Sequence, residues 1–236
     1  MSDAGALLFA RYAYPPNELG YCGPAGASTL LRSDAPAKIA EQARRFEGAW
    51  SYLEFLAASA GIGDPLDETV VEAYWIGNAL LDQVSPGALV GWLESRFRGQ
   101  LGGTWRSAAT RALAHHSFHV FEVYPWAALL GAKAAPVALS VLDRCRIRTG
   151  LVLDINGEQA SVRSRLLRWD GVALTPGPEC DEIVSWSAGG RSLLAPPSPG
   201  DRVALHWDWL CDILTAEQAE RLHALEDRQR SALSGG

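Results

Sequence analysis

Residues 147–162, IRTGLVLDINGEQASV, decide the fold of the second half of the chain. Apolar residues alternate with polar or small ones on both sides of Asn156-Gly157. The apolar positions are Ile147, Leu151, Leu153, Ala160 and Val162. Because Asn and Gly both tolerate the positive φ of a type I′ turn, this stretch predicts a β-hairpin.

Further short strands are predicted downstream, over residues 165–169, 183–187 and 203–209. A proline-rich turn at residues 195–201 leads into the last of them. This spacing is typical of a small antiparallel β-barrel. Thr215-Ala-Glu-Gln218 then matches a capping box and predicts a helix that ends near Leu233.

Upstream of the hairpin the apolar period is helical. Asp34 and Pro36 form a start signal, and Gly61 ends the helix. Its apolar stripe, at three- and four-residue steps, is Ile39, Ala43, Phe46, Trp50, Leu53 and Ala57. We therefore expect an α+β protein with a helical domain (1–142), a small barrel (143–214) and a C-terminal docking helix (215–233).

Composition excludes several classes of function. The chain has 236 residues, is 48% hydrophobic and carries a net charge of −6, which argues against binding nucleic acid or a membrane surface. Its four cysteines form no C-x-x-C pair, and no signal peptide or membrane-spanning run is visible, so we expect a cytoplasmic protein. No nucleotide-binding motif is present, so no cofactor is predicted.

Glu47 is the first candidate for chemistry. It lies at the edge of the helical stripe, between Phe46 and Trp50. A carboxylate beside aromatic rings can receive a cationic amine at the rim of a pocket. The alternative is a solvated glutamate that pairs with Arg44.

Residues 115–126, HHSFHVFEVYPW, can be interpreted as helix or as strand. A helix aligns His115, His119 and Glu122 on one face, as in a metal site. A strand places Glu122 among apolar neighbours, where a carboxylate needs a partner. The remaining interpretations are a structural histidine cluster and a polar, metal-free pocket that contains Glu122.

Two further polar features have a structural and a functional interpretation. Asn78 is the one fully polar residue on an apolar helical face, so its amide bonds either the backbone or a ligand. Residues 17–24, NELGYCGP, are either an ordinary surface turn or a tight loop beside a ligand.

The block from Cys145 to about Leu225 resembles the small hydrogenase-maturation chaperones of the HypC type. The matching motifs are Cys145-Arg-Ile-Arg-Thr-Gly150, Asp154-Ile-Asn-Gly157, Gly200-Asp-Arg-Val-Ala-Leu-His206 and Ile213-Leu-Thr-Ala-Glu-Gln-Ala219. The resemblance implies an OB-like barrel in which Cys145 and His206 hold iron. The residues alone also allow a buried Cys145 and a hydrogen-bonded His206.

The whole chain is similar to an uncharacterised actinobacterial family. The motifs that carry this likeness are Phe9-Ala-Arg-Tyr12, Arg45-Phe-Glu-Gly-Ala-Trp50, Val71-Glu-Ala-Tyr-Trp-Ile-Gly-Asn78 and His115-His-x-Phe-His-Val-Phe-Glu122. The resemblance implies an association with hydrogenase genes. It also implies natural-product pathways that close aziridine or azabicyclic rings on a diamino-acid substrate.

Two functions follow. The first is a cofactor-independent cyclase, in which an amine of a small cationic substrate displaces a leaving group. Glu47 and Glu122 would be its catalytic residues, and its predicted substrate-binding residues are Trp50, Tyr74, Trp75, Asn78, His119 and Trp126. The second is a hydrogenase-maturation accessory protein that holds iron through Cys145 and His206 and docks on a partner subunit.

Overall fold

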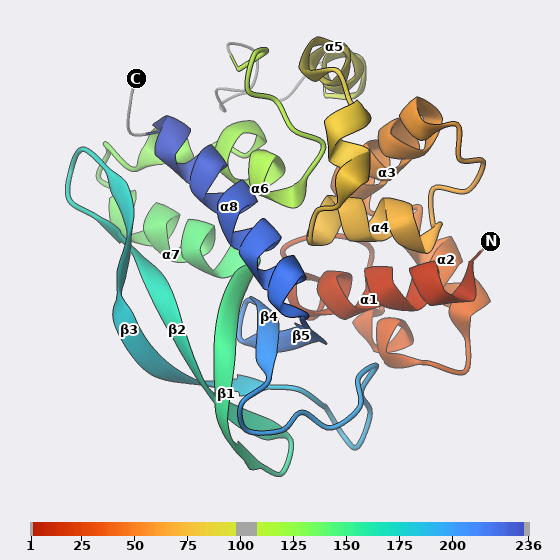
Figure 1. Cartoon of the computed structure of the whole chain (residues 1–236), viewed down its shortest axis with the longest axis vertical. Helices are drawn as coiled ribbons and strands as arrows, with labels where there is room; N and C mark the ends of the chain where they lie inside the picture. The colour runs from red at the N-terminus through yellow and green to blue at the C-terminus, as the bar shows by residue number, and fades with distance from the viewer. Residues whose placement is uncertain (1, 98–107, 234–236) are drawn as a thin grey trace.

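The computed structural model describes residues 2–97 and 108–233. A helical part lies beside a barrel of strands, and one long helix contacts both (Figure 1). None of the described helices combines the length and hydropathy that a membrane span requires. The helical part comprises α1 (Asp3–Glu18), η1 (Ala27–Leu31), α2 (Pro36–Ala43), α3 (Glu47–Ala60), α4 (Glu68–Trp75), η2 (Ala79–Gln83), α5 (Pro86–Arg96), α6 (His116–Phe118), η4 (His119–Val123), η5 (Ala127–Leu129) and α7 (Ala135–Cys145).

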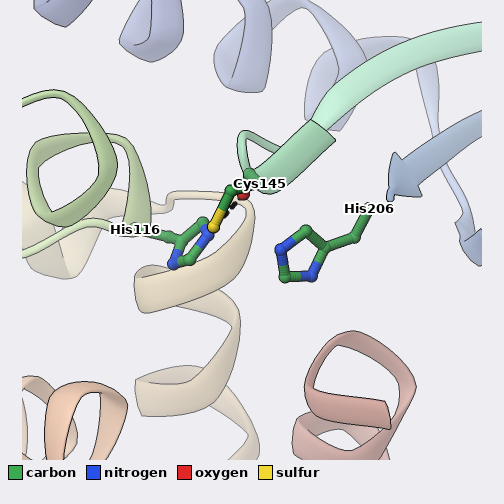
Figure 2. A group of neighbouring side chains, drawn as sticks. All are labelled: His116, Cys145 and His206. Carbon is green, nitrogen blue, oxygen red and sulfur yellow. Dashed lines mark hydrogen bonds between the residues drawn. The ribbon is translucent and has the colours of Figure 1, made fainter. Parts of the chain in front are cut away.

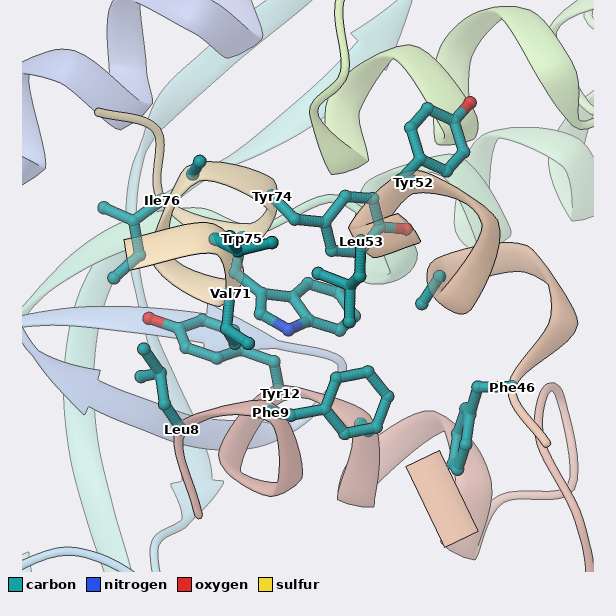
Figure 3. Packing of buried hydrophobic residues seen from close by; sticks show 14 of the residues in the cluster. Leu8, Phe9, Tyr12, Phe46, Tyr52, Leu53, Val71, Tyr74, Trp75 and Ile76 are labelled. Atoms are coloured by element: carbon teal, nitrogen blue, oxygen red, sulfur yellow. The ribbon is translucent and has the colours of Figure 1, made fainter. Parts of the chain in front are cut away.

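Helices α1, α3 and α4 meet in an aromatic core around Trp75 (Figure 3). The Trp75 indole stacks on the ring of Tyr12 at 5.4 Å, and Phe9 packs against it at 6.0 Å. Gly5 lets α1 approach the chain before α4, since a Cβ there would lie 1.9 Å from the carbonyl oxygen of Leu66. This core fixes the end of α4, which carries Tyr74 and Trp75.

The single helix predicted between Pro36 and Gly61 is two helices. α2 ends at Ala43, and α3 begins at Glu47 after Phe46, whose backbone is not helical (φ −87°, ψ 74°). The predicted stripe is nevertheless buried or half-buried throughout, because both helices pack against the same core. The spacing of apolar residues indicates which side chains are buried, but it does not reveal a short break between two helices that pack on the same core.

Five strands follow the helices: β1 (Arg148–Asn156), β2 (Gln159–Trp169), β3 (Leu174–Ser185), β4 (Arg202–His206) and β5 (Trp209–Ile213). They pair in the order β1-β2-β3-β5-β4, which closes on itself as a barrel. β3 and β5 run parallel and meet through the single pair Ser185 and Trp209, whereas the other pairs are antiparallel. The sheet is thus mixed, where an antiparallel one was predicted.

The predicted hairpin joins β1 and β2, but its turn lies one residue later than predicted. Asn156 pairs with Gln159, so the turn residues are Gly157 and Glu158. Gly157 supplies the positive φ, at 58°. The inward side chain of β1 is Val152, which is 1% exposed.

The change from helix to strand falls between Cys145 and Arg148, just after the predicted boundary at residue 142. The helical part and the barrel share one hydrophobic cluster, to which the barrel contributes Ala204 and Trp209. α8 (Ala216–Ala232) then lies against β1, β3, β4, α6 and η4. Its predicted capping box is confirmed.

Residues 116–123 are helical, so the strand interpretation of this stretch is wrong. α6 continues into η4, a π-helical turn in which the amide of Tyr124 donates to the carbonyl of His119 at 2.9 Å. Regular strand geometry is excluded because the backbone amides bond within the segment. The chain becomes extended only at Tyr124.

Candidate metal centre

A cavity of about 970 Å³ lies where the helical part meets the barrel. Its wall includes the loop before η1, the first turn of α3 and the last residues of α4. The stretch from His116 to Trp126, the end of α7 and the end of β4 complete it. The cavity therefore collects side chains from segments far apart in the sequence.

Three side chains in this wall form a candidate ligand set: His116, Cys145 and His206. One ligand atom from each lies within 4.8 Å of the other two (Figure 2). His116 begins α6, Cys145 ends α7 and His206 ends β4. These three side chains are neighbours because the start of α6 and the ends of α7 and β4 meet in the cavity wall.

His206 presents an unused nitrogen in this set. Its Nδ1 lies 2.8 Å from the carbonyl oxygen of Tyr12, which can only accept, so Nδ1 carries the hydrogen. Nε2 then holds a lone pair, is buried, and has no hydrogen-bond partner among the described residues. Metal-binding histidines commonly fix their tautomer in this way, by donating the other ring N–H to a carbonyl.

His116 is oriented by the same kind of bond. Its Nε2 donates to the carbonyl oxygen of Cys145 at 2.8 Å, and its Nδ1 accepts from the hydroxyl of Tyr74 at 3.2 Å. The bond to Cys145 joins two members of the set directly (Figure 2). Tyr74, from α4, links the set to the aromatic core, and a metal bound at Nδ1 of His116 would replace the hydrogen bond from its hydroxyl.

Burial sets the charge of all three groups. It lowers the pKa of His116 to about 4, lowers the pKa of His206 well below its ordinary range, and raises the pKa of the Cys145 thiol. Near neutral pH both imidazoles are therefore neutral, the form that binds metals, and the thiol must release its proton to become a ligand.

The structure brings most of the predicted site residues to this cavity. Glu47 lies in its wall on the first turn of α3, and the other predicted residues there are Tyr74, Trp75, His119, Trp126, Cys145 and His206. Cys145 and His206, which the HypC resemblance singled out, are thus neighbours. The predicted metal triad of His115, His119 and Glu122 is not assembled: in residues 2–97 and 108–233, the group found contains His116 instead.

Glu122, predicted as a catalytic residue, does not belong to the cavity wall. It lies in η4, is fully buried, and its Oε1 accepts from Arg111 Nε at 2.7 Å. An ion pair in this position satisfies the need for a partner that the sequence indicated. Glu122 is therefore a buried carboxylate in an ion pair, outside the wall of this cavity.

Asn78 and Trp50 also lie outside the cavity wall. The Asn78 side chain caps η2 by accepting from the amide of Leu80, and it donates to the carbonyl of Thr69 at 2.8 Å. The Trp50 indole donates to Glu54 at 3.0 Å. Both side chains stabilise their own helices locally.

His116, Tyr124 and Trp207 are among the cavity residues that the sequence did not single out as site residues. His116 stands beside His115, so a histidine pair was visible without a means of choosing between them. Trp207 is the one non-glycine among the described residues with a positive φ, at 56°. Such backbone conformations concentrate at functional sites, but nothing in the sequence around Trp207 predicts one.

A comparison with curated proteins and another with solved structures found no match. A family model does match, and it covers residues 1–234. This coverage agrees with the whole-chain likeness inferred from the sequence motifs. The chain therefore belongs to the family described as a family of unknown function (DUF6390).

Proposed function

We propose that this protein binds one transition-metal ion, or an iron-containing fragment, through His116, Cys145 and His206. The observation that carries the proposal is the buried Nε2 of His206, which has a lone pair, no partner among the described residues, and a neighbouring thiol. A buried polar atom without a partner is costly unless a ligand satisfies it. A metal ion satisfies it directly.

The donor set favours particular metals. A thiolate with two imidazoles suits iron, zinc and copper, and does not suit magnesium or calcium, which prefer oxygen ligands. The HypC resemblance of residues 145–225 favours iron. Three protein ligands also leave a coordination position open for a small molecule or for ligands that the metal brings with it.

An accessory role in metal-centre assembly fits this arrangement. The metal would be cargo, held until a partner subunit receives it. The cavity wall adds aromatic side chains that restrict water around the metal, among them Trp75 and Trp126. Neutral histidines keep the charge of the site low, so the thiolate of Cys145 would be its main anionic ligand.

Metal content after anaerobic purification and reconstitution with iron tests this function. We expect about one equivalent of iron in the wild type and in Cys180→Ser, since Cys180 lies on β3 outside the cavity wall. Cys145→Ser and His206→Ala should lose it. Wild-type protein that retains no iron, zinc or copper after reconstitution and desalting would contradict the proposal.

A second candidate function, ring closure on a cationic amine, is favoured by one observation: the Glu47 carboxylate shares the cavity with Tyr74, Trp75 and Trp126. Aromatic faces and a carboxylate attract a substrate ammonium group. The amine nitrogen would attack the substrate carbon, the bond to the leaving group would break with its electron pair, and Glu47 would accept the N–H proton. The uncapped first turn of α3 offers amide donors to an anionic group of the same substrate.

Turnover by metal-free protein separates the two functions. If ring closure is the activity, Glu47→Gln should lose on the order of a hundredfold in rate, and chelators should have no effect. Glu41→Gln is the matched control, because Glu41 is exposed on α2. Equal rates for wild type, Glu47→Gln and Glu41→Gln would exclude Glu47 as the proton acceptor.

A further inference from the structure

Cys22 lines the same cavity as the ligand set. It lies in residues 19–26, the loop between α1 and η1. Gly20 and Gly23 in this loop have φ angles of 75° and 80°, which glycine adopts without strain. Gly23 also packs closely, since a Cβ there would lie 2.3 Å from the ring of Phe46.

The loop is fastened on both sides of Cys22. The Asn17 side chain donates to the carbonyl of Cys22 at 2.8 Å and to the carbonyl of Pro24 at 2.7 Å. The ring of Tyr21 packs against the ring of Trp207, with 4.1 Å between centroids. Because Trp207 follows His206, this contact holds the loop next to the ligand set.

The two thiols of the cavity also influence each other. Burial raises the pKa of Cys22 to about 12. Burial is likewise the main cause of the raised pKa of Cys145, and a charge on Cys22 raises it further. Both are free cysteines in the wall of one cavity.

We propose that Cys22 is a fourth, displaceable ligand of the metal, which completes a Cys2His2 set; this inference rests on the proposed metal-binding function. The Nε2 of His206 is buried, holds a lone pair and has no hydrogen-bond partner among the described residues, so it is available to bind a metal in this cavity. Four nitrogen and sulfur ligands are the tetrahedral arrangement that zinc and iron(II) favour. Binding a divalent metal would form two metal–sulfur bonds, break two S–H bonds and release two protons, without oxidation.

Cys22 differs from the other ligands in how it is held. His116, Cys145 and His206 lie at the ends of packed elements, whereas Cys22 lies on a loop beside the exposed Tyr21. Cys22 is not in the group whose ligand atoms lie within 4.8 Å, so its coordination requires residues 19–26 to shift and the hydrogen bonds from Asn17 to be broken or remade. The reverse movement would free one coordination position for a receiving partner.

Cobalt(II) titration of the metal-free full chain tests the proposal. Wild type and Cys180→Ser should release two protons per cobalt and show thiolate-to-cobalt charge-transfer absorption. Cys22→Ser should release one proton, show about half of that absorption and bind about a hundredfold more weakly. Thermal melts of the metal-free variants check that each is folded.

The outcomes for Cys22 and for the metal site are distinguishable. If Cys22→Ser matches the wild type in proton release and absorption while Cys145→Ser binds no cobalt, Cys22 is not a ligand and the proposed function stands. If neither the wild type nor any variant binds cobalt, both the Cys22 inference and the proposed metal-binding function are wrong. Alkylation of wild-type protein is the second measurement: cobalt should slow the labelling of Cys22 and leave that of Cys180 unchanged, and an unchanged rate at Cys22 would overturn the inference.

Discussion

Mild acid should destabilise this protein, because His119 is buried in its neutral form. The ring lies among the rings of Tyr52, Phe97 and Tyr124, at centroid distances of 5.4, 6.2 and 4.3 Å. Burial lowers its pKa from 6.5 to about 3, and His116 contributes a smaller effect in the same direction. Between those pH values the unfolded chain binds a proton that the folded chain does not, so stability is lost as the pH falls below about 6.5.

The size of the effect follows from the shift. Between pH 7.5 and pH 5, protonation of His119 in the unfolded chain alone lowers the free energy of unfolding by about 2 kcal/mol. His115 and His116 are buried in the same way, with pKa values of about 3 and about 4. Together these three contribute about 6 kcal/mol, which is comparable to the whole stability of many domains, and His206, whose pKa burial also lowers well below its ordinary range, adds to the loss in the same direction.

Urea unfolding at the two pH values measures this directly. His119→Gln removes one of the four buried, neutral histidines, so its loss of stability between pH 7.5 and pH 5 should be about 2 kcal/mol smaller than that of the wild type. His223→Gln, at an exposed position on α8, is the control and should behave like the wild type. Equal losses for wild type and His119→Gln would refute the assignment of a neutral, buried His119.

Three other substitutions have outcomes that follow from single contacts, each measured by urea unfolding. Arg111→Met should lower the free energy of unfolding by about 2 kcal/mol, because it removes the ion-pair partner of the fully buried Glu122. Gly5→Ala should cost about 2 kcal/mol or more, since the added Cβ collides with the Leu66 carbonyl oxygen, and an unchanged midpoint would show that α1 can shift. Gly157→Ala should cost about 1 kcal/mol through its positive φ, with no effect on metal binding.

Short sequence motifs predicted the elements that are fixed by bonds between nearby residues, such as a helix cap or a hairpin turn. The capping box at Thr215 starts α8 as expected, and the Asn-Gly pair marks the hairpin to within one residue. The turn lies at Gly157-Glu158, and a bulge between Val152 and Asp154 changes which of the following side chains of β1 point inward. Alternation in sequence cannot show a bulge, because the extra residue reverses the faces that follow it.

Two of the three candidate ligands could be identified from the sequence. Cys145 and His206 stood out through the HypC resemblance, whereas His116 was one of two adjacent histidines. Which of the two histidines faces the cavity depends on how α6 is oriented in the fold, and tertiary packing decides that orientation. The partner of Glu122 could not be predicted for the same reason, because Arg111 lies eleven residues earlier in the chain, outside the regular helices and strands.

The position of the candidate ligand set bears on how a metal bound there would be exchanged. His116 and Cys145 belong to the helical part and His206 to the barrel, yet these parts share one hydrophobic cluster and have little freedom to separate. Opening by movement of the whole barrel would expose that cluster and would cost far more than moving one loop. Residues 19–26 pack over the same cavity with an exposed Tyr21 and glycines at positive φ. We therefore expect a bound metal to enter or leave past this loop, with the hydrogen bonds from Asn17 to Cys22 and Pro24 broken on the way.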